Sequence, residues 1–215
     1  LYAVFLVALA VRIAAGLSAP FADAYNRTVG AVCRAAFAWV TAIFPFSLAE
    51  TLLLAALPIG VWYVLYCIKV VPPERLLRHV FGVLAGLALI FSAFFLNYGA
   101  AYGATPLEDK IGLEVTAPGA EELTDATLYT AYTHLSGIYA VYTGEANVNF
   151  NYPDFVIVYT TAHEMAHQRG VAPEDEANFI AYLVCTASDD PYIRYCGYAN
   201  LYESLSDALY SANPD

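Results

Sequence analysis

Charged residues are scarce in this chain of 215 residues. They make up 13% of the sequence, whereas hydrophobic residues make up 60%. A water-soluble domain of this length ordinarily has about a quarter charged and about half apolar residues. The apolar excess is concentrated in residues 1–97. We therefore expect a membrane part followed by a water-facing part.

Basic residues are nearly absent from the second part. Residues 1–97 contain three of the 20 acidic residues, so 17 lie in residues 98–215, beside three of the nine Lys and Arg residues. Such an acidic domain repels phosphate groups, which argues against nucleic acid as a partner. It is also poorly suited to lying flat on anionic lipid.

Three apolar stretches approach the roughly 20 residues that a helix needs to cross a bilayer. They predict transmembrane helices at about residues 1–17, 48–71 and 80–96, with an interfacial amphipathic helix at about 22–46. The first stretch could instead be a signal peptide, and the interfacial helix could be a further span. Because the chain starts inside an apolar run, we expect N-terminal residues to be missing.

The loop between the second and third apolar stretches is basic. It carries Lys69, Arg75, Arg78 and His79 against a single acid, Glu74. Since basic loops stay in the cytoplasm, the third helix is predicted to run outward. We therefore expect a membrane domain at residues 1–97 and an extracytoplasmic domain at residues 98–215.

The second part is predicted to be mostly helical. Pro153 followed by Asp154 is typical of a helix start. Helices are predicted at 121–142, from 154 to about 169, at 174–187 and at about 191–211, with a loop or short strand at 144–152.

The strongest chemical signal is the string His163-Glu164-Met165-Ala166-His167. Residues four apart lie on one face of a helix, so both imidazoles can reach a single Zn²⁺ ion. Glu164 then lies beside the metal, where it can act as a general base. The alternative is a surface helix with two solvated histidines.

A catalytic zinc site needs a third protein ligand. Gly170 lets the chain turn back after the helix, and we predict Glu174 as that ligand, with Glu176 as the main alternative. Asn178 lies four residues after Glu174. It could hold the Glu174 side chain in the right orientation without binding the metal itself. The acids could also serve only to stabilise a helix N-terminus.

A tetrahedral intermediate also needs a hydrogen-bond donor that stabilises its oxyanion. The candidates are Tyr195, Tyr198, Tyr202, Arg194 and His134. With 18 tyrosines in the chain, each of them more often has a packing role, and His134 is expected to be structural.

The four cysteines are not expected to bind the metal. Cys33 and Cys67 are expected to be unpaired, and Cys185 and Cys196 flank a predicted turn between two helices. A disulfide bond between Cys185 and Cys196 would suit an extracytoplasmic domain, but free thiols remain equally open.

The motif resembles that of the gluzincins, metallopeptidases with HExxH and a glutamate on the following helix. Here Asn178 stands where their ExxAD pattern has Asp. The chain is also similar to a bacterial three-pass membrane family catalogued as domain of unknown function 3810. The matching stretches are 45–50, 96–98, 149–154, 163–170, 174–179, 181–183 and 194–198. The resemblance implies a mainly α fold in which three transmembrane helices precede a zincin-like domain.

We therefore expect a zinc metallopeptidase in the bacterial cytoplasmic membrane that acts on peptides or proteins outside the cytoplasm. A non-catalytic zinc-binding module for membrane assembly is the alternative. Glu164 favours the enzyme, because a purely structural zinc site does not need a carboxylate there. The substrate and the oligomeric state are left open by the sequence.

Overall fold

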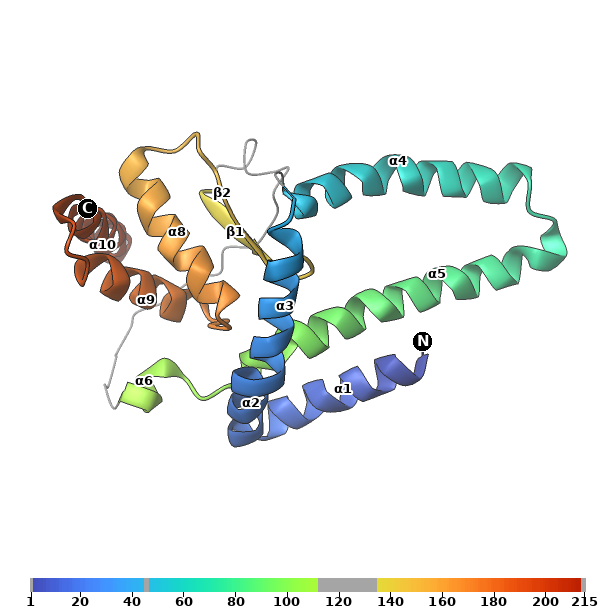
Figure 1. The fold of residues 1–215 in the computed structure, drawn as a ribbon, viewed down its shortest axis with the longest axis horizontal. Coiled ribbons are helices and arrows are strands. Elements are labelled where there is room, and N and C mark those ends of the chain that lie inside the picture. The colour runs from blue at the N-terminus through green and yellow to red at the C-terminus, as the bar shows by residue number, and fades with distance from the viewer. Residues whose placement is uncertain (1, 45–46, 112–134, 214–215) are drawn as a thin grey trace. The chain divides into compact units, whose positions relative to one another are not determined.

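The structure is a computed structural model that describes residues 2–44, 47–111 and 135–213. It is mainly helical, and a two-stranded sheet is present among the described residues (Figure 1). The chain divides into two compact units. The first comprises residues 1–104 and 141–145, and the second comprises residues 105–140 and 146–215.

The first unit is built from helices. They are α1 (Tyr2–Leu17), α2 (Ala19–Tyr25), the π-helix η1 (Asn26–Gly30), α3 (Ala31–Thr41), α4 (Leu48–Lys69), α5 (Pro73–Phe94), the π-helix η2 (Phe95–Gly99) and the 3₁₀-helix η3 (Ala101–Gly103). In the interval from 22 to 46, where one interfacial helix was predicted, the structure has most of α2 and then η1 and α3 in succession.

Among the described residues of the first unit, two helical segments are long and apolar enough to cross a membrane. They are Leu48–Lys69, with 22 residues, and Pro73–Gly99, with 27 residues. The second begins before the predicted residue 80, because Pro73 occupies the first helical turn and Glu74 follows it. Helix α1 is apolar but has 16 residues, fewer than the roughly 20 that a span needs. The third span stays a prediction.

A buried arginine joins the two π-helices of the first unit. The Arg34 side chain, 3% exposed, donates from Nη1 to the Asn97 carbonyl at 3.2 Å and from Nη2 to the Asn26 carbonyl at 3.0 Å. Tyr25 donates its hydroxyl proton to the Leu96 carbonyl at 2.9 Å. A π-helix frees backbone carbonyls from the regular ladder, and these side chains satisfy them.

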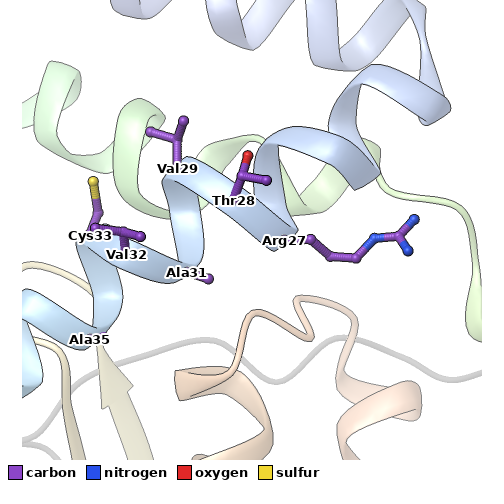
Figure 2. A pocket seen from close by; sticks show the side chains of 7 residues that line it. All are labelled: Arg27, Thr28, Val29, Ala31, Val32, Cys33 and Ala35. Atoms are coloured by element: carbon purple, nitrogen blue, oxygen red, sulfur yellow. The ribbon is translucent and has the colours of Figure 1, made fainter.

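A shallow, mostly apolar groove runs along η1 and the start of α3 (Figure 2). It is lined by Arg27, Thr28, Val29, Ala31, Val32, Cys33 and Ala35. Arg27 lies at one end of the labelled row and Ala35 at the other. None of the residues predicted to carry chemistry lines this groove.

The second unit contains three longer helices and most of the sheet. Its elements are α6 (Leu107–Ile111), β1 (Gly137–Ala140), β2 (Glu145–Val148), α8 (Asp154–Gln168), α9 (Glu174–Thr186) and α10 (Pro191–Ala212). Glu145, the first residue of β2, belongs to the first unit. Small buried side chains, Ala166, Ala177, Ala181 and Cys196 among them, allow α8, α9 and α10 to approach closely.

The predicted starts of α8, α9 and α10 are confirmed. Strand β2 lies inside the interval predicted as a loop or short strand. The predicted helix at 121–142 is wrong at residues 137–140, which form β1. Its part from 121 to 134 lies outside the described residues, and so does His134. A sheet partner, β2, overrides the weak helical pattern there.

Candidate metal centre

Helix α8 places His163 and His167 on the same face, as their spacing predicts. Their ring centroids are 4.6 Å apart, and the two Nε2 atoms lie 3.0 Å from each other. The His167 side chain is 7% exposed and that of His163 is 14% exposed. The two imidazoles therefore converge in a nearly water-excluded position.

The turn after α8 fixes the tautomer of His167. His167 Nδ1 donates a proton to the Val171 carbonyl at 2.7 Å, because a carbonyl oxygen can only accept. In the neutral imidazole the lone pair is then on Nε2, the atom that faces His163. Metal-binding histidines are commonly held in this way, by a hydrogen bond from the second ring nitrogen to a carbonyl group.

Gly170 makes this turn possible. Its φ is 95°, in the left-handed region that glycine adopts without strain. The Gly170 N–H donates to the His167 carbonyl at 2.8 Å, and the Val171 N–H donates to the Ala166 carbonyl at 3.2 Å. This pair of bonds is a Schellman motif, and it reverses the chain so that α9 starts beside the two histidines.

Glu174, the first residue of α9, completes the cluster. Its Oε2 atom lies 3.1 Å from His163 Nε2 and 3.3 Å from His167 Nε2. Ligand atoms at about 2.0–2.2 Å from a tetrahedral Zn²⁺ ion are about 3.3–3.6 Å from one another. The observed separations are a few tenths of an ångström shorter, so the three residues fit one metal ion.

Electrostatics ties Glu174 to both histidines. Partial burial opposes its ionisation, but hydrogen bonds with His163 and with the protonated form of His167 outweigh burial and lower the pKa of Glu174 to about 2. Burial lowers the pKa of His167, yet the hydrogen bond and the charge of Glu174 outweigh it, so the net pKa is raised. The carboxylate side chain is 54% exposed, which leaves one side of the cluster open to solvent.

Glu164 lies beside this cluster but is held differently. It is 4% exposed, and burial raises its pKa to about 7, against the opposing charges of His163 and His167. The backbone of Tyr139 in β1 donates a hydrogen bond to the carboxylate. The Oε2 atom is buried and has no hydrogen-bond partner among the described residues. A carboxyl group in this state can accept or donate a proton near neutral pH.

Strand β1 packs closely on α8 at Gly137. A Cβ atom at this position would lie 2.9 Å from Glu164 Cγ and 2.5 Å from Thr160 Cγ2. The sequence did not predict that Gly137 packs against Glu164 or that the Tyr139 backbone hydrogen-bonds to its carboxylate. A signal was present, because an isolated glycine next to an apolar run often marks close backbone approach.

The other predicted site residues do not join the cluster in the described contacts. Glu176 accepts a hydrogen bond from the Leu107 N–H at 2.7 Å, and the Asn178 carbonyl accepts one from the Tyr159 hydroxyl at 2.8 Å. The Arg194 guanidinium donates to the carbonyl groups of Ser188 and Asp189. Three roles therefore stay predictions: Glu176 as a metal ligand, Asn178 as the group that orients Glu174, and Arg194 as the oxyanion donor.

The three candidate tyrosines lie on α10. Tyr195 contacts the ring of Phe155 edge-on, and Tyr198 contacts Tyr182 in the same manner. Tyr202 is 74% exposed. No described hydrogen bond or ring contact joins them to His163 or His167, so a role as oxyanion donor stays a prediction. Cys185 and Cys196 are both buried and carry free thiols.

Comparison with known proteins gives a family but no named relative. Neither the curated proteins nor the solved structures include a match to this chain. A family model matches in two overlapping segments, residues 25–131 and 126–215. These segments contain α4, α5 and the whole histidine–glutamate cluster, and the chain belongs to the family described as "Protein of unknown function (DUF3810)".

Proposed function

We propose that this chain is a membrane-anchored zinc hydrolase that cleaves peptide bonds. One observation carries the proposal: ligand atoms of His163, His167 and Glu174 lie within 4.8 Å of one another. Two imidazole nitrogens and one carboxylate oxygen form the ligand set of several zinc peptidases and leave a fourth position for water or substrate. Zn²⁺ at this position would polarise a carbonyl group and lower the pKa of a water molecule.

Glu164 supplies the proton transfers in this proposal. Its buried carboxylate takes a proton from the attacking water and later gives it to the leaving amine. A pKa of about 7 suits a group that must both accept and donate a proton at neutral pH. The Tyr139 N–H holds one part of the carboxylate, and the buried Oε2 atom is left for the water molecule.

The choice of peptides as substrate rests on resemblance. HExxH followed by a glutamate at the start of the next helix is the arrangement of the gluzincins, and α8 and α9 carry these residues here. The same resemblance motivates a zincin-like fold for the second unit. The membrane segments favour substrates at or near a lipid surface, because they hold the enzyme there.

The outward location of the second unit rests on charge. Lys69, at the end of α4, and Arg75 and Arg78, in the first turns of α5, surround the short connection between the two apolar helices. By the positive-inside rule this connection is cytoplasmic. The acidic second unit would then lie outside, and the exposed apolar side chains of α3 would contact lipid at the membrane surface.

The decisive experiment measures bound zinc and peptide cleavage on the detergent-purified full chain. We expect one zinc per chain in the wild type and in Glu164→Gln, with cleavage lost in Glu164→Gln. Glu174→Gln should bind zinc far more weakly, whereas Glu176→Gln, two residues further on, should keep it. Full zinc loading with no cleavage of a broad peptide library would instead favour a non-catalytic zinc module.

Topology has a separate test. A reporter that folds only outside the cytoplasm, fused after Asp215, should be active, and one that works only in the cytoplasm should be silent. Activity of the cytoplasmic reporter would overturn the outward orientation without affecting the zinc assignment.

A further inference from the structure

The hairpin formed by β1 and β2 is divided between the two units. Residues 141–145, which are the turn and the first residue of β2, belong to the first unit, and the rest of both strands belongs to the second. These five residues are here called the hairpin turn. The chain therefore passes from the second unit into the first and back again within one hairpin.

The carboxylate of Glu145 holds the hairpin turn at the start of α4. Its Oε1 atom accepts a hydrogen bond from the Leu48 N–H at 2.8 Å, and its Oε2 atom accepts one from the Ala49 N–H at 2.7 Å. The first N–H groups of a helix have no partner within the helix and carry partial positive charge, so a carboxylate is a strong acceptor for them. Moving Glu145 away breaks two charge-assisted hydrogen bonds at once.

Two further residues of the hairpin turn contact the end of the second apolar segment. Asn97 in η2 is 4% exposed, and its Nδ2 atom donates a hydrogen bond to the Val141 carbonyl. The ring centroids of Tyr142 and of Phe94 in α5 are 6.5 Å apart. The start of the hairpin turn is thus fixed by one buried hydrogen bond and one ring contact.

The backbone of the hairpin turn also packs closely on α3. Gly144 has a φ of 74°, and a Cβ atom there would lie 2.8 Å from the backbone nitrogen of Ala38. Thr143, the preceding residue, is 4% exposed. Contacts with α3, α4, α5 and η2 therefore hold this short segment from several sides.

The other part of the hairpin holds Glu164 in the second unit. The Tyr139 backbone donates a hydrogen bond to its carboxylate, and a Cβ atom on Gly137 would lie 2.9 Å from Glu164 Cγ. Val141 follows Tyr139 by two residues, which is about 7 Å along a strand. Because no flexible linker separates them, a shift of the hairpin turn must move the backbone group that holds Glu164.

We propose that the first unit positions Glu164 through the hairpin turn, with Glu145 and Asn97 as positioning residues. The role of Glu164 as proton carrier rests on the proposed function. Glu145 and Asn97 act through β1 and not on the substrate. Proton transfer in the second unit then requires the helices of the membrane-anchoring unit to be assembled around the hairpin turn. The proposed zinc ligands are brought together by the turn at Gly170 instead, so they do not depend on it.

The first test measures amide hydrogen exchange of residues 137–140 in the detergent-purified full chain. Glu145→Ala should speed this exchange at least about tenfold, because two hydrogen bonds to a charged group are lost. Glu74→Ala is the matched control, since it removes an exposed acid from the first turn of the other long apolar helix. This control should change the exchange less than about twofold. Unchanged exchange in Glu145→Ala, or equal acceleration at residues 170–171, overturns the proposal.

The second test measures cleavage of a peptide that the wild type accepts. Glu145→Ala should lower kcat by about 10- to 100-fold, because a misplacement of up to about 1 Å at a reacting group costs that much. KM and zinc affinity should stay within about twofold. Glu145→Gln keeps one acceptor oxygen and should lie between the wild type and Glu145→Ala, and Asn97→Ala should also lower kcat alone.

Two kinetic results would contradict the positioning role. They are a kcat of Glu145→Ala within about twofold of the wild type, and a loss of zinc affinity as large as the loss of kcat. A wild type that cleaves no peptide would overturn the proposed function. The exchange of residues 137–140 would then still decide whether the first unit positions Glu164, because that measurement depends on neither zinc nor cleavage.

Discussion

A methyl group at position 137 would press directly on the side chain of Glu164. The Cβ of an alanine there would lie 2.9 Å from Glu164 Cγ, 2.9 Å from the Asn147 carbonyl oxygen and 2.5 Å from Thr160 Cγ2. Ordinary contacts of a Cβ atom begin near 3.4 Å. Gly137→Ala must therefore move Glu164 Cγ by about 0.5 Å and Thr160 Cγ2 by about 0.9 Å, or move β1 by comparable amounts.

These displacements should lower both the free energy of unfolding and the rate of catalysis. Overpacking of this kind costs about 1–3 kcal/mol of the free energy of unfolding. A misplacement of about 1 Å at a reacting group can cost about 100-fold in rate, so a shift of half that size should reduce kcat by about tenfold. The proposed zinc ligands lie on α8 and α9, and none of them is among the three atoms nearest to a Cβ at position 137, so zinc affinity should be nearly unchanged.

The assay combines zinc content, thermal unfolding and peptide cleavage. Thr160→Ser in the same chain removes Cγ2, the closest of the three contacts, and should restore part of the stability but not kcat. Gly82→Ala is the control, because a Cβ atom there meets nothing within 4 Å. A zinc-loaded Gly137→Ala variant with wild-type kcat would refute the idea that β1 positions Glu164.

Three further changes have directions set by the structure. Gly170→Ala puts a side chain at a φ of 95°, so it should cost about 1–2 kcal/mol and weaken zinc binding, as a zinc titration would show. Glu145→Gln removes the charge from a carboxylate that accepts from the Leu48 and Ala49 N–H groups at 2.8 and 2.7 Å, and should lower the free energy of unfolding by about 1 kcal/mol. In zinc-free protein the pKa of Glu174 is lowered to about 2 from an ordinary 4.5. Its stabilising contribution is therefore complete above the ordinary pKa and is lost as the pH falls from about 4.5 to about 2. Acid titrations of unfolding should show this loss in the wild type and not in Glu174→Gln.

The helices that could be predicted are those whose limits are marked by nearby residues in the sequence. The apolar run at 48–71, followed by Pro72 and Pro73, predicted the limits of α4 to within two residues. The start of α5 was placed late, because Arg75 and Arg78 interrupt the apolar pattern although they do not end the helix. In the second unit, proline followed by acidic residues marked the starts of α8 and α9.

Strand β1 was not predictable from local pattern. Residues 137–140 form a strand because β2 pairs with them and because Gly137 allows close packing on Thr160 and Glu164. The contacts of Gly137 with Thr160 and Glu164 join residues 23 and 27 positions apart, which no periodicity within a short window can reveal. Sequence alone also does not say which face of α10 packs inward, so it does not choose among Tyr195, Tyr198 and Tyr202 as oxyanion donor.

The proposed metal site and the proposed proton carrier therefore depend on sequence in different ways. The three proposed ligands lie within 12 residues, from His163 to Glu174, and the turn at Gly170 brings them together through local hydrogen bonds. The environment of Glu164 instead depends on β1, which reaches α8 from an earlier part of the chain. Local contacts form at little cost in chain entropy, whereas the approach of β1 requires a larger loop to close. Variants in β1 should consequently separate the two properties and leave a protein that binds zinc but transfers protons poorly.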